Sequence, residues 1–333
     1  MAVFRQLDVP AARTLGRLFG VEVVGATPLA RGSVNSNFRL ALADGRAVFA
    51  RVYEEQDERG AAWETALVTH LAHAGVPTPP ALARVDGRGR VATLGAGAAA
   101  RPVALFAWSG GEVLCQASVR PRVAWDVGAA LARVHRAAAR FADGRPGRFG
   151  VAELRTRCAT IARATDPELL AVAPVLDAEL AAAAAARTPG LPGGVVHGDL
   201  FRDNVLWRDG RVVALLDFES AGAETWAYDL MVTVLAWCFG AALDESLVHA
   251  LLAGYQSERP LAPAETAALA TEARFAALRF TVTRITDFAL RPASAAGRTK
   301  DWRRFRARLA ALEALGPARL SRLASTPLTR PPA

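Results

Sequence analysis

The stretch VVHGDLFRDNVLWRDGRVVALLDF, residues 195–218, is the most informative part of this sequence. It begins as a short apolar strand and continues into a polar loop. Two apolar runs follow, at 204–207 and 211–218, and Asp209-Gly210 joins them. This dipeptide accepts the positive φ angles of a tight hairpin turn. The sequence therefore predicts a polar loop that is held rigid by a β-hairpin.

Polar side chains in this loop have the spacing H-x-D-x-x-x-x-N, and an aspartate in the pair D-F ends the next strand. They are His197, Asp199, Asn204 and Asp217. Protein-kinase-type enzymes use this spacing for phosphoryl transfer, in which a carboxylate accepts the proton of the attacking hydroxyl. Hard oxygen ligands hold Mg²⁺ against the phosphates. The pattern predicts Asp199 as the base, and Asn204 and Asp217 as metal ligands. His197 belongs to the same catalytic group, where we expect it to brace the loop more than to take part in chemistry.

Each of these side chains also has a structural interpretation when it is taken alone. Asp, Asn and His are common in turns, because their side chains bond to local backbone groups. Four of them in register on one hairpin, with apolar strands between them, favour the catalytic interpretation.

Two segments of the chain, HGDLFRDN at 197–204 and LDFESAGAETWAYDL at 216–230, resemble the aminoglycoside phosphotransferase and choline kinase superfamily. The wording FRDNV followed by YDLMVTVLAWCF is similar to the bacterial homoserine kinase branch. Weaker matches to that branch are GSVNSNF at 32–38, LRFTVTRITDF at 278–288 and KDWRRF at 300–305. The resemblance spans nearly the whole chain. It implies an α+β, protein-kinase-like bilobal fold, with a small antiparallel β-sheet lobe that binds nucleotide and a mostly helical lobe that carries the catalytic loop.

The same resemblance implies an ATP- and Mg²⁺-dependent phosphotransferase acting on the hydroxyl of a small molecule. Homoserine kinase, which makes O-phospho-L-homoserine for threonine synthesis, is the activity it favours. A kinase for an amino alcohol, a sugar or an aminoglycoside is one alternative. A catalytically silent nucleotide-binding module is the other, but such a module has no need of both the base and the metal ligands.

The chain length predicts more than one core. At 333 residues the chain exceeds the size at which a single hydrophobic core keeps growing. We expect a nucleotide-binding lobe over residues 1–108 and a helical lobe with the acceptor site over residues 109–315. Gly316-Pro317 should stop the last helix and leave residues 316–333 as a flexible tail.

Composition narrows the classes of partner. The net charge is +8, but Lys300 is the only lysine and the arginines are spread over every segment, so we expect no nucleic-acid partner. Three scattered cysteines fit a reducing cytoplasm. The longest uncharged apolar run, 230–243, is too short to span a bilayer. A cytoplasmic protein without a membrane partner is expected, and the oligomeric state stays open.

The first half of the chain contains the expected nucleotide contacts. Short strands are predicted at 21–29, 36–43, 47–53 and 101–108. In the turn RGSVNSN, the resemblance implies that Ser33, Asn35 and Ser36 contact phosphate oxygens, although a plain hairpin loop has the same composition. Arg51 stands where the superfamily usually has a phosphate-pairing lysine, and Glu64 is its expected ion-pair partner. Arginine is permanently cationic and can fork onto phosphate oxygens, yet it is not equivalent to lysine.

The acceptor site should complement its substrate in charge. Homoserine has a carboxylate, so an arginine is wanted, and Arg202 lies three residues after the expected base. It could touch the γ-phosphate or the carboxylate of the acceptor. Arg279 and Arg284 lie on a mostly apolar helix, where an unpaired cation is costly. A pair of Arg284 with Asp287 on the same helix face is the structural alternative.

Two further features are open from the sequence. Asp229 reads most simply as the N-cap of a buried helix, whereas the resemblance implies a structural aspartate that supports the catalytic loop. A choline site would need an aromatic cage, to which Trp226, Tyr228 and Trp237 could contribute.

Overall fold

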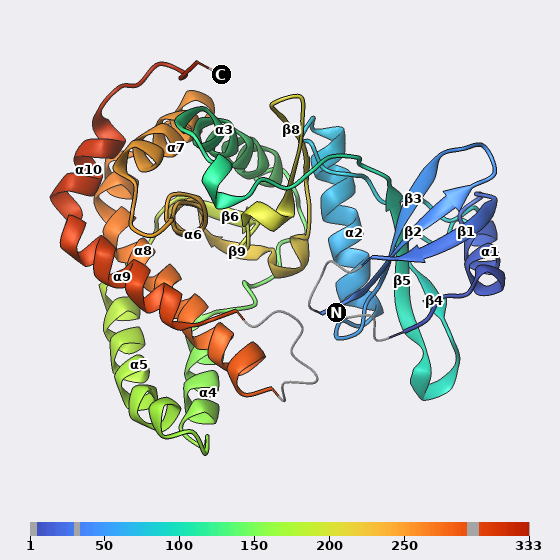
Figure 1. Ribbon diagram of the computed structural model, residues 1–333, viewed down its shortest axis with the longest axis horizontal. Coiled ribbons are helices and arrows are strands. Elements are labelled where there is room, and N and C mark those ends of the chain that lie inside the picture. The colour runs from blue at the N-terminus through green and yellow to red at the C-terminus, as the bar shows by residue number, and fades with distance from the viewer. Residues whose placement is uncertain (1–4, 30–33, 292–299, 333) are drawn as a thin grey trace. The chain divides into compact units, whose positions relative to one another are not determined.

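The computed structural model describes residues 5–29, 34–291 and 300–332. The chain divides into two compact units, and the division falls after Gly110. Each unit has its own secondary structure and its own hydrophobic core, so each is described by itself (Figure 1).

The N-terminal unit is built on a five-stranded antiparallel sheet with the strand order β1-β2-β3-β5-β4. Its elements are α1 (Val9–Leu18), β1 (Val23–Pro28), β2 (Ser36–Leu42), β3 (Ala47–Val52), α2 (Glu58–His73), β4 (Ala92–Leu94) and β5 (Arg101–Ala107). Asp8 caps α1 by accepting from the Ala11 N–H at 2.8 Å, a common role of aspartate.

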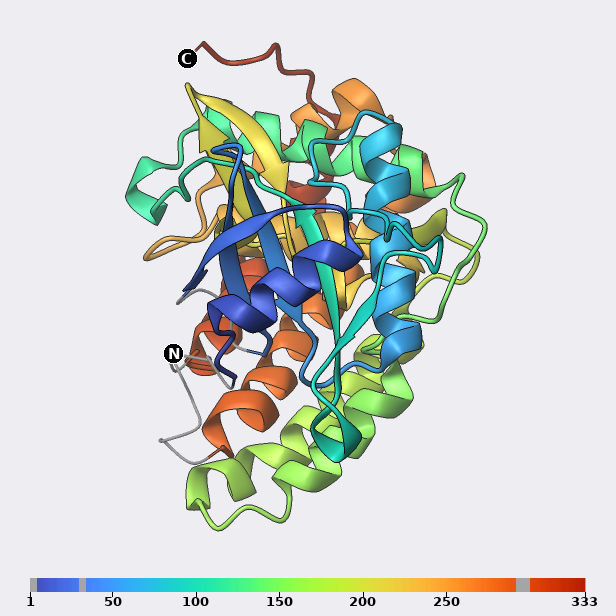
Figure 2. The same ribbon diagram turned by 90° about the vertical axis from the view of Figure 1, so that its right-hand side faces the viewer.

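Alternation along the strands assigns the two faces of this sheet. Phe38 and Leu40 of β2, and Val48 and Ala50 of β3, belong to the core cluster that also contains residues of α1. Figure 2 shows α1 lying across the sheet. Since successive side chains of a strand point to opposite faces, Arg51 of β3 belongs to the other face, toward its hydrogen-bond partner on α2.

The C-terminal unit is mostly helical, with two small antiparallel sheets, β6-β9 and β7-β8. Its strands are β6 (Gly193–Val196), β7 (Val205–Arg208), β8 (Arg211–Leu215) and β9 (Gly222–Thr225). Its helices are α3 (Pro121–Ala138), α4 (Val151–Ile161), α5 (Pro167–Ala186), α6 (Trp226–Trp237), α7 (Glu245–Glu258), α8 (Pro263–Arg284), α9 (Arg303–Leu315) and α10 (Pro317–Ser325). A π-helical turn, η5 (Ile285–Ala289), extends α8, and short 3₁₀ turns lie at η3 (Arg202–Asn204) and η4 (Phe218–Ser220).

The predicted hairpin is confirmed. Strands β7 and β8 pair, and the turn residues Asp209 and Gly210 have φ angles of 51° and 68°. Both values lie in the left-handed region that a tight hairpin turn requires.

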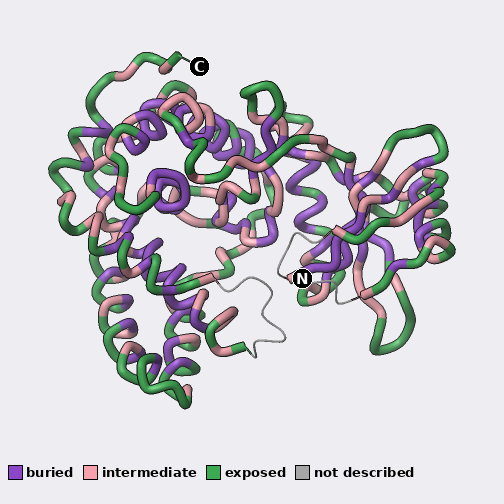
Figure 3. Tube along the Cα trace, viewed as in Figure 1, coloured by how far each residue is buried: buried purple, intermediate pink, exposed green. Residues whose placement is uncertain are grey.

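Two helices under the catalytic loop are the most deeply buried part of this unit. Every residue of α6 after Trp226 is buried, and most of α8 is buried as well, as the tube in Figure 3 shows for α6. Beside them, α3 and α7 pack closely through two glycines. A Cβ atom on Gly128 would lie 2.1 Å from the Leu251 carbonyl oxygen, and one on Gly254 would lie 2.1 Å from that of Trp125. Only glycine permits this approach, which brings polar side chains of α3 and α7 within hydrogen-bonding distance.

The prediction of a flexible tail over residues 316–333 is wrong for its first half. Helix α10 begins directly after Gly316, because Pro317 is well suited to a first helical position. Leu320, Leu323 and Ala324 recur at helical spacing and are buried. The chain therefore gains apolar contacts by forming a helix here.

Among the described residues, α5 is long and apolar enough to cross a membrane by length and composition alone. One face of it belongs to the core cluster formed with α4, α6, α8 and α9. Its acidic residues form ion pairs: Glu168 with Arg303, Asp177 with Arg155, and Glu179 with Arg306. In this structure α5 is a layer of the folded unit.

Candidate active site

Asp229 anchors the catalytic loop. It lies in the first turn of α6, is fully buried, and accepts hydrogen bonds from the backbone N–H groups of His197 at 2.9 Å and Gly198 at 2.8 Å. Thr225 is the N-cap of α6 instead, since its hydroxyl accepts from the Tyr228 N–H. The interpretation of Asp229 as the N-cap is therefore wrong, and its position under the loop agrees with the structural role that the resemblance implied.

A buried histidine completes this anchor. His135 of α3 donates its Nε2–H to Asp229 at 2.9 Å, and the hydroxyl of Tyr255 on α7 lies 2.8 Å from its Nδ1. Burial alone would raise the pKa of Asp229, but the hydrogen bond from His135 and the proximity of His197 outweigh it, so the pKa lies below its usual value. The sequence offered little signal for this chain of contacts, because a single histidine on an apolar helix is usually a packing residue.

His197 is a positioning residue in this structure. Its ring is completely buried; Nδ1 accepts from the Asp199 N–H at 3.2 Å, and Nε2–H donates to the Leu216 carbonyl at 3.0 Å. Burial lowers its pKa, so the ring is neutral and both nitrogens are used within the protein. His197 thus connects the catalytic loop to Leu216, the residue that follows β8. This is the bracing role that we expected from the sequence.

Asp199 is partly accessible, with a side chain that is 27% exposed. Asn204 Nδ2 donates to the Asp199 carbonyl oxygen at 2.8 Å and lies 3.5 Å from Oδ2, which orients both residues. Burial raises the pKa of Asp199 to about 6; the cations of Lys300 and Arg279 oppose this shift, and the charge of Asp217 adds to it. A carboxylate with that pKa is ionised at neutral pH and remains basic enough to take a proton.

The two predicted metal ligands lie across the hairpin from each other. The Leu216 N–H donates to the Asn204 carbonyl at 2.8 Å. Asp217 is the next residue after Leu216, so this hydrogen bond holds its backbone near Asn204. Asp217 has φ 68° and ψ 65°, a left-handed conformation that is uncommon outside glycine and often found at functional sites. The donor set is one amide oxygen and one carboxylate, since the amide nitrogen of Asn204 is used by Asp199.

This pair of oxygen ligands fits Mg²⁺, which is usually bound by one or two protein side chains together with phosphate oxygens and water. Within the described ranges, no group of three or more His, Cys, Asp or Glu side chains could hold a metal ion. A cation at the hairpin would therefore depend on a phosphate-bearing ligand.

One arginine lies close to the Asp199 carboxylate, and another follows it in the chain. Arg279 Nη1 lies 3.9 Å from Asp199 Oδ1, and its guanidinium stacks on Phe280 with 3.7 Å between Cζ and the ring centroid. Arg202 follows on η3, where burial lowers its pKa against the opposing charge of Asp203. Arg279 therefore lies beside the expected base, and Arg202 belongs to the catalytic loop itself.

The predicted pair of Arg284 with Asp287 does not form. Asp287 accepts from Arg157 of α4 at 2.6 Å instead, while Arg284 donates to the Asp301 carbonyl at 3.0 Å. The reason is local: α8 ends at Arg284 and continues as a π-helical turn, which widens the spacing that would place residues three apart on one face.

The N-terminal unit holds the expected nucleotide-side residues. Arg51 Nη1 donates to Glu64 Oε1 at 2.9 Å, and their side chains are 9% and 3% exposed. The Ser36 hydroxyl donates to Glu54 at 2.7 Å, and Asn35 Oδ1 accepts from the Glu54 N–H at 3.2 Å. Both side chains thus help to hold the end of the turn, and their contact with phosphate stays a prediction. Ser33 lies outside the described residues.

Trp226, Tyr228 and Trp237 do not form an aromatic cage for choline, and the ring of Trp226 is covered by the Arg259 guanidinium, with Cζ 4.2 Å from its centroid. Trp237 is fully buried and donates its Nε1–H to the Leu200 carbonyl at 2.9 Å, so it supports the catalytic loop from below. Tyr228 is also buried, with 4% of its surface exposed.

Comparison with known proteins agrees with this geometry. A model of the phosphotransferase enzyme family (APH) matches residues 25–261. A homoserine kinase of Azorhizobium caulinodans is 35% identical over 309 residues, covering 90% of this chain and 92% of that protein. A homoserine kinase of Methylorubrum populi is 33% identical over 313 residues, covering 93% and 95%.

Solved structures show the same fold. An amicoumacin kinase has 16% sequence identity and a TM-score of 0.70, covering 93% of this chain and 92% of that one. A choline kinase from Cryptosporidium parvum has 15% identity and a TM-score of 0.59, covering 91% and 93%. The predicted α+β, protein-kinase-like fold is confirmed. The chain belongs to the phosphotransferase enzyme family, and its most similar relatives include homoserine kinases that match it over nearly their whole length.

Proposed function

We propose that this chain is an ATP- and Mg²⁺-dependent homoserine kinase that converts L-homoserine to O-phospho-L-homoserine. The observation that carries the proposal is the geometry around Asp199: a partly exposed carboxylate with a pKa near 6, beside an amide-carboxylate pair suited to Mg²⁺ and near the cations of Arg279 and Lys300, which suit an anionic acceptor. Relatives named homoserine kinase, about 35% identical over 90% of the chain, support homoserine as the acceptor.

A similar solved structure and the residues of this chain together support a nucleotide and a divalent metal ion as ligands. The related amicoumacin kinase was solved with AMP-PNP and Ca²⁺, which supports a nucleotide with a divalent cation here. Asn204 and Asp217 would hold Mg²⁺, which neutralises charge on the phosphates when it is bound. Arg51, fixed by Glu64, would contact the nucleotide phosphates in place of the usual lysine, with Ser33, Asn35 and Ser36 near the same phosphates.

The residues of the chain position the acceptor hydroxyl and the catalytic loop. Asp199 orients the homoserine hydroxyl and accepts its proton as the new O–P bond forms and the bond between the γ-phosphorus and the β-γ bridging oxygen breaks, releasing ADP. His197 and Asp229 keep the loop in the geometry that this step needs. A general base of this kind contributes about 10² to 10⁴ in rate.

The test is ADP release by the purified protein with Mg²⁺-ATP, with and without L-homoserine, beside 3-aminopropan-1-ol, choline and an aminoglycoside. We expect saturable stimulation by homoserine, and a loss of about 10² to 10⁴ in turnover for Asp199→Asn with ATP binding retained. Stimulation by another alcohol and not by homoserine would move the protein to a different small-molecule kinase. ATP binding without turnover of any acceptor would favour a silent nucleotide-binding module.

A further inference from the structure

Arg308 of α9 is a buried cation with no carboxylate partner in the part of the chain that the structure describes. The residue is 8% exposed, and its Nε and Nη1 have no hydrogen-bond partner among the described residues. The residues outside the described ranges, 1–4, 30–33, 292–299 and 333, include no aspartate or glutamate. Burying an ionised group without a partner is costly. A ligand that supplies the missing charge would remove that cost.

The neighbours of Arg308 increase this cost. Arg308 and Arg284 both lie over the ring of Phe305, with 4.6 Å and 4.4 Å between Cζ and the ring centroid. Arg284 Nε is also buried without a partner among the described residues. Burial, followed by the charges of Arg284, Arg304 and Arg202, lowers the pKa of Arg308 to about 9. The ring of Phe305 compensates only part of the charge of the two guanidinium groups. The pair of Arg308 and Arg284 therefore favours an anion.

The protein treats comparable arginines of the same unit differently. Other largely buried arginines have a carboxylate within 4 Å: Arg157 pairs with Asp287, Arg187 with Glu224 and Glu272, and Arg259 with Glu265. Arg279, whose Nε and Nη1 also lack a hydrogen-bond partner among the described residues, has Asp199 Oδ1 at 3.9 Å. A folded unit that pairs these arginines and leaves Arg308 unpaired has a site built for a charge that comes from outside the chain.

Arg284 and Arg308 lie close to the catalytic loop, and their guanidinium groups suit particular anions. The charge of Asp199 acts on Arg284, and Arg202 is three residues after Asp199 on the catalytic loop. An anionic group held by Arg284 and Arg308 would therefore lie within electrostatic range of the catalytic base, as the charged group of a bound acceptor would. The planar fork of a guanidinium matches a carboxylate or a phosphate in two parallel hydrogen bonds.

We propose that Arg308 and Arg284 bind the carboxylate of the acceptor and so select an amino acid over an amino alcohol of the same length. This inference rests on the proposed homoserine kinase activity and adds the residues that determine its specificity. It separates two acceptors that differ in one group, because 3-aminopropan-1-ol is homoserine without its carboxylate.

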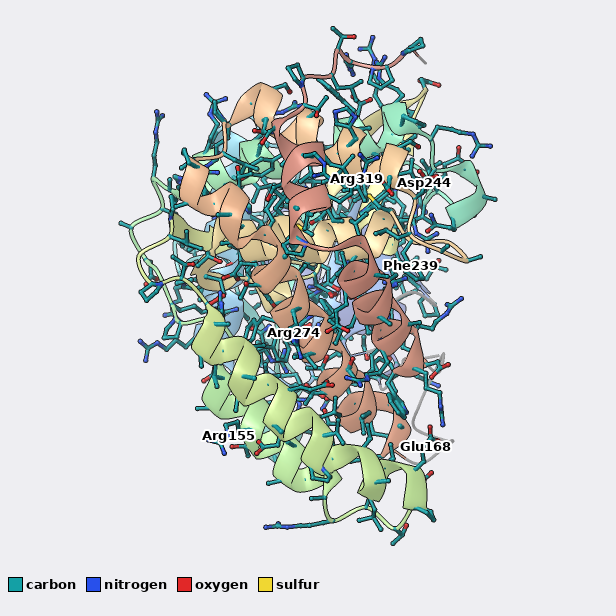
Figure 4. All side chains as sticks on the ribbon, turned by 90° about the vertical axis from the view of Figure 1, so that its left-hand side faces the viewer. Arg155, Glu168, Phe239, Asp244, Arg274 and Arg319 are labelled. Carbon is teal, nitrogen blue, oxygen red and sulfur yellow. The ribbon has the colours of Figure 1, made fainter. Side chains whose placement is uncertain are left out.

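The experiment compares kcat/KM for L-homoserine and for 3-aminopropan-1-ol in the wild type and in Arg308→Met, Arg308→Lys and Arg319→Met. Arg319 is the matched control: it lies on α10 (Figure 4), is 48% exposed and pairs with Glu245. We expect Arg308→Met to lose about 10- to 100-fold in kcat/KM for homoserine, the range of a charged hydrogen bond, with little change for 3-aminopropan-1-ol. Arg308→Lys should recover part of the loss, and the control should match the wild type.

Two more readouts distinguish binding from structural damage. Arg308→Met should unfold at the same or a higher temperature than the wild type without ligand, because removing an unpaired buried charge relieves a cost. Isothermal titration should show that homoserine binds to Arg308→Met about 10- to 100-fold more weakly than to the wild type. Homoserine binding that depends on Arg308, without turnover, would refute the proposed kinase activity and leave this inference standing.

Three outcomes would overturn the inference. One is an unchanged preference for homoserine in Arg308→Met, including an equal loss for both acceptors. A second is equal use of both acceptors by the wild type. The third is a rise of about 10-fold or more in the KM for ATP with the acceptor preference intact, which would assign the cluster to nucleotide phosphates.

Discussion

Replacing Arg279 by methionine should move the pH dependence of the reaction. Arg279 Nη1 lies 3.9 Å from Asp199 Oδ1, and at an effective dielectric constant of about 20 that separation corresponds to about 4 kcal/mol, or about 3 pKa units. Because the Asp199 side chain is 27% exposed, water screens part of this attraction, and we expect a shift of about 1 to 2 units. The pKa of Asp199, now about 6, would rise to between about 7 and 8 in the variant.

The assay is the pH dependence of kcat/KM for homoserine, which reports the pKa values of the free enzyme. A base must be ionised to act, so activity should rise with pH through a midpoint near 6 in the wild type and through a midpoint at least about one unit higher in Arg279→Met. Arg274→Met is the control, since Arg274 is on the same helix (Figure 4), pairs with Glu313 and is 39% exposed. An unmoved midpoint in Arg279→Met would refute the electrostatic coupling. A wild-type midpoint near pH 4 would refute the raised pKa of Asp199.

Three more substitutions test other parts of the site. Asp229→Ala should lower the free energy of unfolding by about 3 to 5 kcal/mol in a urea titration at pH 7, because it leaves buried donors unpaired, whereas the exposed control Asp177→Ala should change it by less than about 1 kcal/mol. Since the folded pKa of Asp229 is lowered, the stabilisation is present above pH 4 and disappears at lower pH. Equal stability of the two variants would contradict the role of Asp229 as an anchor. Glu64→Gln should cost about 3 kcal/mol in thermal unfolding, because it leaves Arg51 buried opposite a neutral group, and an unchanged unfolding temperature would argue against a stabilising pair. Asp217→Asn should weaken nucleotide binding by about 10-fold or more in titrations with Mg²⁺ and have little effect without it; equal affinity in both conditions would remove Asp217 from the metal site.

The catalytic hairpin could be predicted because its information is local. Asp199 and Asn204 precede β7 and Asp217 follows β8, so they flank one hairpin, and the turn dipeptide Asp209-Gly210 fixes its register. Once the hairpin forms, the backbone alone brings Asn204 next to the residue before Asp217. The fold class followed from the same stretch through its resemblance to known kinases.

Local sequence was misleading where a helix was irregular or began after an apparent stop. The three-residue spacing of Arg284 and Asp287 suggested a pair on one helix face, yet the π-helical turn changes that spacing. Gly316-Pro317 ends α9 as predicted, but the same proline begins α10. Tertiary contacts of the apolar residues that follow determine that outcome.

The sequence by itself determined the type and order of the catalytic groups, because a single hairpin brings together the side chains that the chemistry requires. Only the tertiary structure determined what surrounds them. His135 is 94 residues from Asp229 in the sequence, and Arg157 is 130 residues from Asp287. Which buried charges find partners, and that Arg308 finds none among the described residues, depends on how distant helices pack. The partner of a buried charge is fixed by three-dimensional proximity, which spacing along the chain does not encode.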